Sequence, residues 1–414
     1  MGMNATKSIN ESNLNLGTVT NTLISFEFLF VLFLFSGVVK ELYGVNILLD
    51  TTFVLMILVS LSMTYLIYRR SEVTHIQIVC VILLVLFLAY TFMTGLFING
   101  ENYFMRKMIG TSTTILAFFS SVFVIATRPV RVRKLIQSLY LFSIISGIVA
   151  ILKLVFLSAG SLQELVQYQL MTLLLGIGFI LSFHYTLMNR KKIKKALIYS
   201  FLTMFFILML SSSGGRGPFI SSIIANVLLL ITVFISNKTN IKKLVQIIVS
   251  FFSIILTSGF IFSYLGVVPR TIERILITID SPLESRLMYY PTAIRSIINN
   301  PLFGIGFGGW PSVWDQVHDH PHNLLLEVTT ELGLAGLFLF TLVIVYPLSY
   351  FRPVIDIQNS KKTIIILLLV YLFIWRMVSG DLTSDRFLFT FIGLLIYPSI
   401  RHCQADNIKL NLFG

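Results

Sequence analysis

Residues 300–336 read NPLFGIGFGGWPSVWDQVHDHPHNLLLEVTTELGLAG, a polar and glycine-rich stretch within an otherwise apolar chain. Its glycines allow tight backbone turns, and Trp310 and Trp314 are amphipathic side chains suited to a membrane surface. His318, His320 and His322 follow closely and precede an apolar run that is long enough to cross a bilayer. We therefore expect the chemistry of this protein to lie in this stretch.

The surrounding sequence is that of a polytopic membrane protein. Hydrophobic residues make up 56% of the chain, charged residues make up 12%, and the mean hydropathy is +0.87, which is far from the balance of a soluble domain. Apolar runs matched to about 30 Å of hydrocarbon predict an all-α fold with about twelve transmembrane helices. We place these spans at residues 22–39, 46–68, 75–98, 108–127, 135–158, 166–188, 196–212, 218–236, 244–266, 323–349, 363–380 and 386–400. The polar start of the chain and the lack of a small-residue cleavage site predict no removable signal peptide.

Positive charge alternates between the predicted loops. With the amino terminus in the cytoplasm, 20 of the 31 Lys and Arg residues fall inside and 10 outside, while Lys153 lies within a span. The positive-inside rule then predicts that both termini are cytoplasmic. The basic residues form no stripe interleaved with aromatic residues, so the formal charge of +13 does not indicate nucleic-acid binding. Cys80 in a span and Cys403 in the tail predict no disulfide.

This topology divides the chain into three parts. Residues 1–265 carry spans one to nine, residues 266–322 form one large extracytoplasmic loop, and residues 323–414 carry spans ten to twelve and a cytoplasmic tail. Within the loop, residues 286–299 have apolar residues at helical spacing, which predicts a short helix on the membrane surface with Pro291 at its start or at a kink. The expected site faces the outside of the membrane.

Arg216 stands in a second, very short external loop that reads SSSGGRGPF. A lone arginine at a span end is often an interface anchor. Positive charge is scarce on this side, however, and backbone amides of Gly214, Gly215 and Gly217 could join a guanidinium in holding phosphate oxygens. The amino-terminal end of the next span would also favour an anion there.

The histidines and nearby carboxylates allow several roles. Three alternating histidines could bind a metal ion, but a loop containing Pro321 gives no assurance that they converge. His322 instead could accept a proton as a neutral imidazole, while Asn323 suits a helix cap. Placing the carboxylates of Glu327 and Glu331 in hydrocarbon costs free energy, so we expect them to face a wet cavity or to pair with arginines. Glu331 could also interact favourably with the dipole of the helix.

Other polar residues gather near the outer ends of the spans. Lys153 could snorkel or could help an anionic headgroup to dock. A further group, where spans eleven and twelve meet, could form mutual ion pairs that hold the rim of a cavity, and it comprises Arg376, Asp381, Asp385 and Arg386.

The run HNLLLEVTTELGLAG, the upstream NPLFGIGFGGW, Arg286 and the glycine-flanked Arg216 together resemble the O-antigen ligase and O-antigen polymerase (Wzy) superfamily of bacterial membrane glycosyltransferases. The resemblance covers the second half of the chain in motif detail and the whole chain in its plan of spans and loops. It implies a GT-C-like membrane glycosyltransferase fold and an outward-facing cavity for undecaprenyl diphosphate-linked glycans, without a metal or another cofactor. Ser285 stands where the family often has glycine before the loop arginine.

The resemblance assigns catalytic roles to Arg216, Arg286 and His322. Both arginines would grip the diphosphate, and His322 or Glu327 would take the proton from the acceptor hydroxyl in an inverting reaction. We name as candidate substrate-binding residues Arg295, Glu327, Lys153, His320 and Trp310.

The expected activity is polymerisation of lipid-linked repeat units, of the O-antigen or capsule type, on the outer face of the bacterial cytoplasmic membrane. The expected partners are the lipid-linked glycan, membrane lipid and a chain-length regulator protein. One alternative is ligation of the glycan to lipid A core. Another is a lipid-linked oligosaccharide transporter, which the absence of an obvious internal repeat disfavours.

Overall fold

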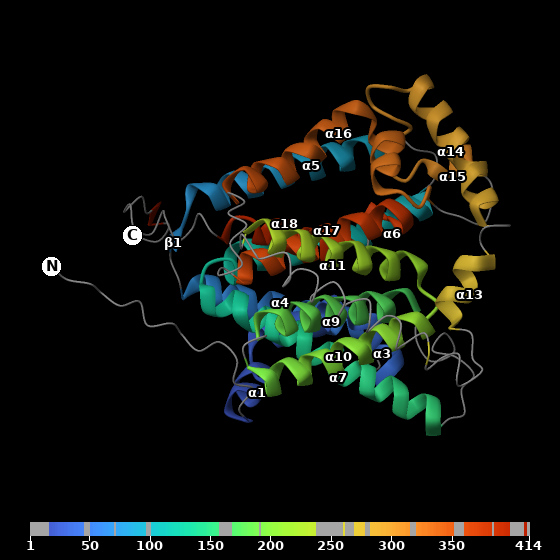
Figure 1. The fold of residues 1–414 in the computed structure, drawn as a ribbon. Coiled ribbons are helices and arrows are strands. Elements are labelled where there is room, and N and C mark those ends of the chain that lie inside the picture. The colour runs from blue at the N-terminus through green and yellow to red at the C-terminus, as the bar shows by residue number, and fades with distance from the viewer. Residues whose placement is uncertain are drawn as a thin grey trace.

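The structure is a computed structural model that describes residues 16–44, 50–69, 72–96, 101–156, 168–189, 192–236, 260, 269–277, 282–314, 320–351, 360–382, 385–397 and 410–411. Within these ranges the chain is helical apart from two short strands and the turns and loops that connect the elements (Figure 1). The first half of the chain contains α1 (Leu16–Leu23), α2 (Phe26–Leu34), α3 (Ser36–Tyr43), α4 (Thr51–Tyr68), β1 (Glu72–Val73), α5 (His75–Gly95), α6 (Glu101–Ser120), the π-helix η1 (Ser121–Ile125), α7 (Pro129–Phe156) and α9 (Tyr168–Met188). The second half contains α10 (Ile193–Ser212), α11 (Arg216–Ser236), α13 (Arg270–Ile277), α14 (Pro282–Asn299), α15 (Trp310–Val313), α16 (Leu324–Tyr350), α17 (Ser360–Ser379), α18 (Arg386–Leu394) and β2 (Leu410–Asn411).

Nine helical segments of the described residues are long and apolar enough to cross a membrane. They are Thr51–Tyr68, His75–Gly95, Tyr103–Ile125, Pro129–Lys153, Gln169–Met188, Ile193–Ser212, Arg216–Val233, Leu324–Tyr350 and Lys361–Ser379. Each of the nine overlaps a span expected from the sequence. The polytopic membrane class is thereby confirmed.

The three other expected spans differ from these nine. Residues 22–39 cover the end of α1, all of α2 and the start of α3, because the chain breaks before α2 and again at Phe35, whose backbone φ and ψ are −106° and 31°. The expected ninth span, residues 244–266, lies outside the described residues except for Phe260. The expected twelfth span begins as the nine-residue helix α18. The count of about twelve therefore stays a prediction.

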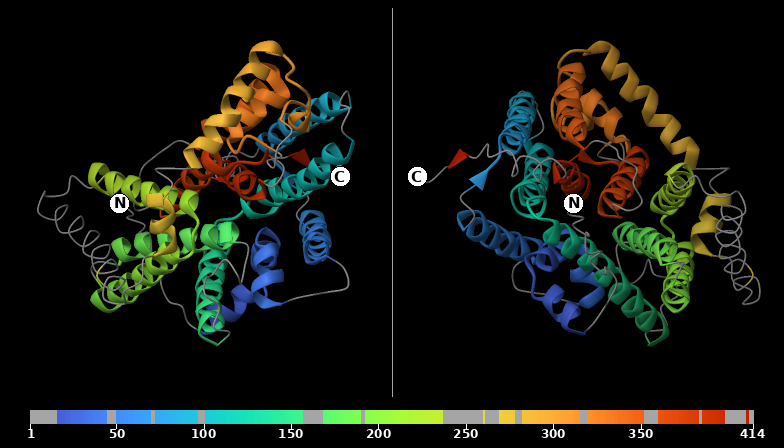
Figure 2. Two further views of the ribbon diagram at one scale, coloured as in Figure 1. Left: turned by 90° about the vertical axis from the view of Figure 1, so that its right-hand side faces the viewer. Right: turned by 60° about the vertical axis from the view of Figure 1, so that its left-hand side comes forward.

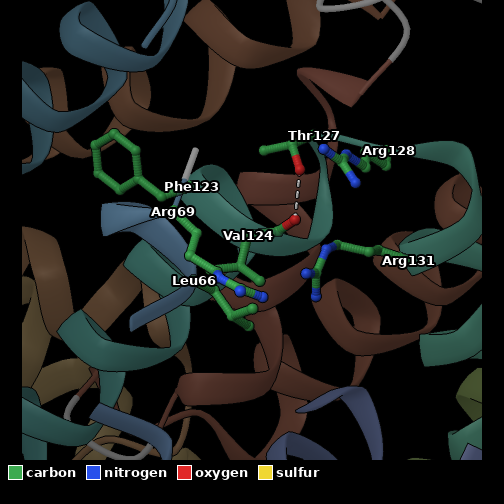
Figure 3. A pocket seen from close by; sticks show the side chains of 7 residues that line it. All are labelled: Leu66, Arg69, Phe123, Val124, Thr127, Arg128 and Arg131. Carbon is green, nitrogen blue, oxygen red and sulfur yellow. Dashed lines mark hydrogen bonds between the residues drawn. The ribbon is translucent and has the colours of Figure 1, made fainter. Parts of the chain in front are cut away.

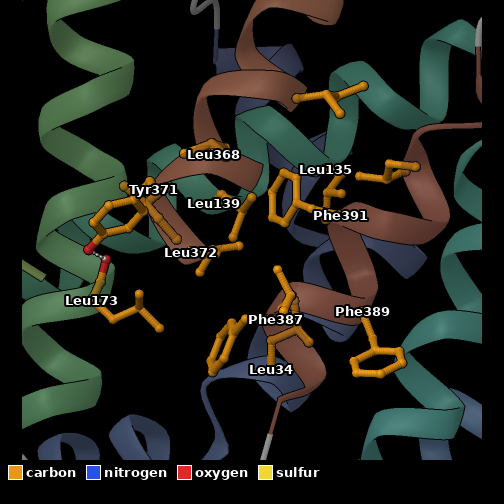
Figure 4. Close-up of a cluster of buried hydrophobic side chains, with 14 of the residues drawn as sticks. Leu34, Leu135, Leu139, Leu173, Leu368, Tyr371, Leu372, Phe387, Phe389 and Phe391 are labelled. Atoms are coloured by element: carbon orange, nitrogen blue, oxygen red, sulfur yellow. Dashed lines mark hydrogen bonds between the residues drawn. The ribbon is translucent and has the colours of Figure 1, made fainter. Parts of the chain in front are cut away.

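The core of the helical assembly lies around α18 and α17. All residues of α18 after Arg386 are buried, and Phe35 packs on Phe387 with ring centroids 4.7 Å apart. Figure 4 shows apolar side chains of α2, α7, α17 and α18 meeting there, with the Tyr371 hydroxyl donating to the Leu173 carbonyl at 3.0 Å. After Arg386 the short helix α18 is buried by protein, which explains why it need not match the bilayer thickness.

The two ends of the helical assembly carry different secondary-structure elements. At one end lie the short helices α13, α14 and α15, and α14 crosses that end from the neighbourhood of α13 to α16 (Figures 1 and 2). At the other end β1 pairs with β2 in antiparallel register beside the turn from α4 to α5. We call these the α14 end and the β1 end. Residues 410–411 therefore lie at the end opposite to the histidine-rich stretch.

The helix expected at residues 286–299 is confirmed, although it begins earlier than its apolar pattern indicates. It starts at Pro282, so Pro291 lies inside α14 rather than at its start. Pro282 suits this start, because the first backbone N–H groups of a helix have no partner within the helix and proline has no N–H to leave unbonded. Residues 266–322 contribute α13, α14 and α15 to the described structure, and their placement outside the membrane stays a prediction.

Candidate functional site

The glycine-rich loop is attached to a break in α16. Gly333 has φ +65° and ψ −167° inside that helix, which interrupts the helical hydrogen bonds and leaves carbonyls to be satisfied elsewhere. The loop supplies donors, because the amides of Ile305 and Gly306 donate to the carbonyls of Thr330 and Glu331 at 3.0 and 2.8 Å. A Cβ on Gly333 would lie 2.3 Å from the Leu302 carbonyl oxygen. Glycine is therefore required at this close backbone approach.

A buried lysine holds both carboxylates of α16. Lys107 Nζ lies 2.7 Å from Glu327 Oε1 and 2.6 Å from Glu331 Oε2, and all three side chains are at most 2% exposed. The carboxylates accept further bonds from the amides of Leu382 at 3.1 Å and Gly308 at 2.9 Å. This cluster joins α6, the glycine-rich loop, α16 and the segment after α17. Glu327 and Glu331 were expected to face a wet cavity or to pair with arginines, but their partner is a lysine.

The histidine stretch ends directly beside this cluster. His322 has φ +52°, an uncommon backbone conformation for a non-glycine residue. Its ring lies 4.2 Å from the ring of His320 and 6.0 Å from that of Tyr289 in α14, centroid to centroid. Burial lowers the pKa of His320, which keeps its imidazole neutral near pH 7. Backbone strain of this kind is common where a side chain must be aimed at a substrate.

Asn323 fixes the position of His322 relative to α17. Its side-chain oxygen accepts from the Leu326 amide at 3.0 Å, so the expected helix cap is confirmed. Its side-chain nitrogen also donates to the Met377 carbonyl at 3.0 Å. His322 is thereby anchored to the last turn of α17.

Arg216 begins α11 and is bonded reciprocally to α13. It donates to the Arg274 carbonyl at 3.3 Å, while Arg274 donates to the Gly214 carbonyl at 3.0 Å. Two guanidinium groups therefore lie beside one glycine-rich turn. Both are partly exposed, which leaves them accessible from the α14 end.

The glycines of this turn serve packing, in contrast to the sequence-based expectation of open amides. The Gly214 amide donates to Thr271 Oγ1 at 2.9 Å, so it is not available to a phosphate. A Cβ on Gly215 would lie 2.4 Å from Thr172 Oγ1, and one on Gly217 would lie 3.1 Å from the Trp375 ring. The turn therefore fits closely against α9 and α17.

The last turn of α17 connects the arginine side of the site to the histidine side. Gly217, next to Arg216, packs on Trp375, and Asn323, next to His322, binds the Met377 carbonyl. The same turn carries Arg376, which forms a buried ion pair with Asp385 and lies over the Trp375 ring at 4.1 Å. Arg216 and His322 are thus each next to a residue that contacts this end of α17. This pair between spans eleven and twelve matches the mutual ion pairing expected from the sequence.

The other expected site residues are spread over the α14 end. Arg286 lies in α14 three residues before Tyr289, but its side chain lies outside the described part of the structure, as does His318. Arg295 is exposed on α14, and Lys153 is half-buried in the last turn of α7. Trp310 is fully buried and stacks on Trp314, so it packs the loop in this structure. Their roles in substrate binding stay predictions.

Sequence reasoning missed Lys107 and Arg274. Lys107 precedes the span expected at residues 108–127 and so counted as a loop cation, whereas the helix begins at Glu101 and carries it inside. The signal was an ionisable residue flanking an apolar run, which demands a partner of opposite charge. Arg274 gave no local signal, because its link to Gly214 spans 60 residues of sequence.

The metal hypothesis for the histidines gains no support from the residues described. Within those ranges no group of three or more His, Cys, Asp and Glu side chains could hold a metal ion. Of the three histidines, His320 and His322 are described and lie ring to ring.

Comparisons with known proteins bear on the same residues. Residues 199–341 match the family model described as O-antigen ligase, and this range includes Arg216, Arg274 and His322. Over this range the chain is similar to the O-antigen ligase and polymerase superfamily. The resemblance seen in the sequence motifs is thereby confirmed.

Three relatives are similar to this chain over longer ranges. A putative polysaccharide ligase of Rickettsia conorii is 22% identical over 313 residues, which cover 58% of this chain and 75% of the relative. An uncharacterised protein of Haemophilus influenzae is 23% identical over 352 residues, which cover 77% of this chain and 83% of the relative. A putative polysaccharide ligase of Rickettsia felis is 25% identical over 191 residues, which cover 42% of this chain and 44% of the relative.

Proposed function

We propose that the protein is an inverting, metal-independent membrane glycosyltransferase that moves a glycan from an undecaprenyl diphosphate carrier to a hydroxyl acceptor. The observation that carries this proposal is the arrangement of Arg216 and His322 on either side of the last turn of α17. A fixed spacing between an anion-binding group and a candidate base is what transfer from a phosphorylated donor requires.

The donor diphosphate would lie against Arg216 and Arg274. Planar guanidinium groups match phosphate oxygens in two-bonded geometry and stabilise the charge that develops on the leaving group. The reciprocal bonds between the Gly214 turn and α13 hold both groups in register. Arg286, in α14 at the same end, is the loop arginine that the family resemblance assigns to the diphosphate together with Arg216.

His322 is favoured over Glu327 as the base. Glu327 is fully buried and bonded to Lys107 and the Leu382 amide, so proton transfer to it would disturb an ion pair. His322 is partly exposed and contacts the ring of His320. We assign the Lys107 cluster a positioning role, because it fixes the first turns of α16 next to His322.

The proposed step is a single displacement. The acceptor hydroxyl oxygen forms a bond to the anomeric carbon as the bond from that carbon to the diphosphate oxygen breaks. The electron pair leaves with undecaprenyl diphosphate, whose charge the arginines stabilise, and the hydroxyl proton passes to His322. Attack opposite the leaving group inverts the anomeric configuration.

The identity of the acceptor distinguishes a ligase from a polymerase. The family description and the Rickettsia relatives name ligases, which supports transfer to a lipid A core type of acceptor. Polymerisation, in which the acceptor is another lipid-linked repeat unit, uses the same chemistry and stays the alternative.

The test is a reconstituted assay with purified protein, a defined undecaprenyl diphosphate-linked repeat unit and EDTA, given lipid A core or further repeat unit as acceptor. The variants are His322→Ala and Arg216→Ala. Their controls are His75→Ala and Arg270→Ala, since His75 is exposed at the start of α5 and Arg270 forms an exposed pair with Glu273. Mass spectrometry of the glycolipids reads the product.

We expect a transfer product that survives EDTA and both controls and falls by at least about 100-fold in each site variant, the scale of losing a charge-stabilising or proton-transfer group. Product on lipid A core identifies a ligase, and a ladder of lengthened lipid-linked glycan identifies a polymerase. Full activity of either site variant would remove that residue from the mechanism. Silence with both acceptors would return attention to a transporter.

A further inference from the structure

A second polar site lies at the β1 end, far from the candidate active site. Lys107, near the start of α6, belongs to the site at the α14 end, while Phe123 and Val124 in η1 line a pocket at the other end of the same continuous helix. Val124 lies 17 residues after Lys107 along the helix, which corresponds to about 25 Å of rise. A ligand in this pocket could not touch the transfer chemistry.

Three arginines line this pocket of about 350 Å³. The described lining side chains are Leu66, Arg69, Phe123, Val124, Thr127, Arg128 and Arg131, and none of these is a carboxylate. Figure 3 shows the guanidinium groups of Arg69 and Arg131 pointing toward one another across the pocket. Like charges aimed at the same space repel one another, unless an anion lies between them.

The protein itself neutralises one of these charges. Arg131 lies 2.9 Å from Glu27, whose carboxylate is only 2% exposed. Arg69 lies over the ring of Tyr65 in α4, with Cζ 5.3 Å from the ring centroid. This contact orients the guanidinium group but supplies no negative charge. Among the described contacts, two of the three positive charges therefore have no acidic counterpart.

The chemistry of the pocket fits a phosphate group. Several guanidinium groups around one space are the arrangement that binds phosphate oxygens in pairs. The apolar wall of Leu66, Phe123 and Val124 suits the glycerol or carbon portion attached to that phosphate. Tyr65 and Tyr68, at the end of α4, are 56% and 74% exposed, as is typical of aromatic residues at a bilayer interface.

We propose that this arginine pocket binds a phosphate group, carried by an anionic lipid headgroup or by a soluble phosphorylated molecule. The exposed tyrosines and the lipid-facing helix α4 favour the lipid source. The π-helical turn contributes to the pocket, because η1 widens the helix where Phe123 and Val124 meet Arg69. The positive-inside rule alone requires scattered cations but no shared cavity.

The first arm of the test uses native mass spectrometry of the detergent-purified protein with equal amounts of phosphatidic acid, phosphatidylglycerol and phosphatidylcholine. The second arm measures thermal stabilisation by inorganic phosphate against chloride at equal ionic strength. The variants are Arg69→Gln, Arg128→Gln and the double variant. Arg131 is retained because its removal would leave Glu27 buried and unpaired. The control is Lys194→Gln, an exposed cation at the start of α10.

We expect wild type to retain the anionic lipids over phosphatidylcholine, with binding about fivefold weaker for each arginine replaced and unchanged in Lys194→Gln. Stabilisation by phosphate without lipid preference, again lost in the double variant, would identify a soluble ligand and still support the site. If wild type shows neither effect, or if the arginine variants behave like Lys194→Gln, the proposal is wrong. The wild-type comparison decides even where a variant does not fold.

Discussion

Replacement of Lys107 by Met is expected to destabilise the α14 end strongly. The side chain is 2% exposed and lies within 2.7 Å of both Glu327 and Glu331. Methionine fills a similar volume but leaves two buried carboxylates with only the Leu382 and Gly308 amides as partners. Removing one partner of a buried ion pair costs about 3–5 kcal/mol, because the remaining charge stays desolvated.

A control variant separates the stability lost with the buried ion pair from the effect of simply removing a positive charge. Lys40→Met is the matched control, since Lys40 pairs with Asp50 at 3.6 Å with both side chains more than half exposed. An exposed pair of this kind contributes about 0–1 kcal/mol. Adding Glu331→Gln to Lys107→Met removes one buried negative charge and should recover part of the loss.

The assay is reversible unfolding in mixed detergent, followed by tryptophan fluorescence. Trp310, Trp314 and Trp375 all lie near the candidate site, so the signal reports the end of the molecule where the change is made. We expect Lys107→Met to lose about 3–5 kcal/mol in unfolding free energy and the double variant to lose less. A loss no larger than that of Lys40→Met would refute the ion-pair reasoning.

Two further predictions concern the backbone and the pH response. Gly333→Ala should be far more destabilising than Gly44→Ala in the same unfolding assay: both glycines have φ near +65°, but the added Cβ meets backbone atoms within 2.4 Å at Gly333 and nothing within 4 Å at Gly44. Equal losses would show that conformational strain of about 1–3 kcal/mol is the whole effect. Burial lowers the pKa of His320, so folded protein binds its proton less readily than unfolded protein, and stability should fall as pH drops below the ordinary histidine pKa of about 6.5. His320→Gln should flatten the melting temperature between about pH 7 and pH 5, whereas the exposed His75→Gln should not; equal slopes would contradict this assignment.

Several elements of the fold and site follow from local sequence alone. The apolar runs predict the nine helices of the described residues that are long enough to cross a membrane, because hydrocarbon admits a backbone only when its hydrogen bonds close within the helix. Asn323 caps α16 through a partner three residues away. The glycine-flanked Arg216 and His322 before α16 belong to motifs that can be recognised from the sequence without knowing which residues are in contact. These features depend on neighbours along the chain, which the sequence displays.

The tertiary structure alone decided how these parts combine. Lys107 meets Glu327 and Glu331 across more than 200 residues of sequence, and Arg274 meets Gly214 across 60. The break between α2 and α3 was also missed, because it falls inside an apolar run whose only local signal is the Ser36–Gly37 pair after Phe35, and Phe35 packs on Phe387 far along the chain. Charge pairs and aromatic contacts of this kind depend on which helices become neighbours. The sequence by itself therefore determined that this is a helical membrane protein with an arginine and a histidine in family motifs. Only helix packing decided that the neighbours of both residues contact the last turn of α17 and that a lysine pairs with the two carboxylates of α16.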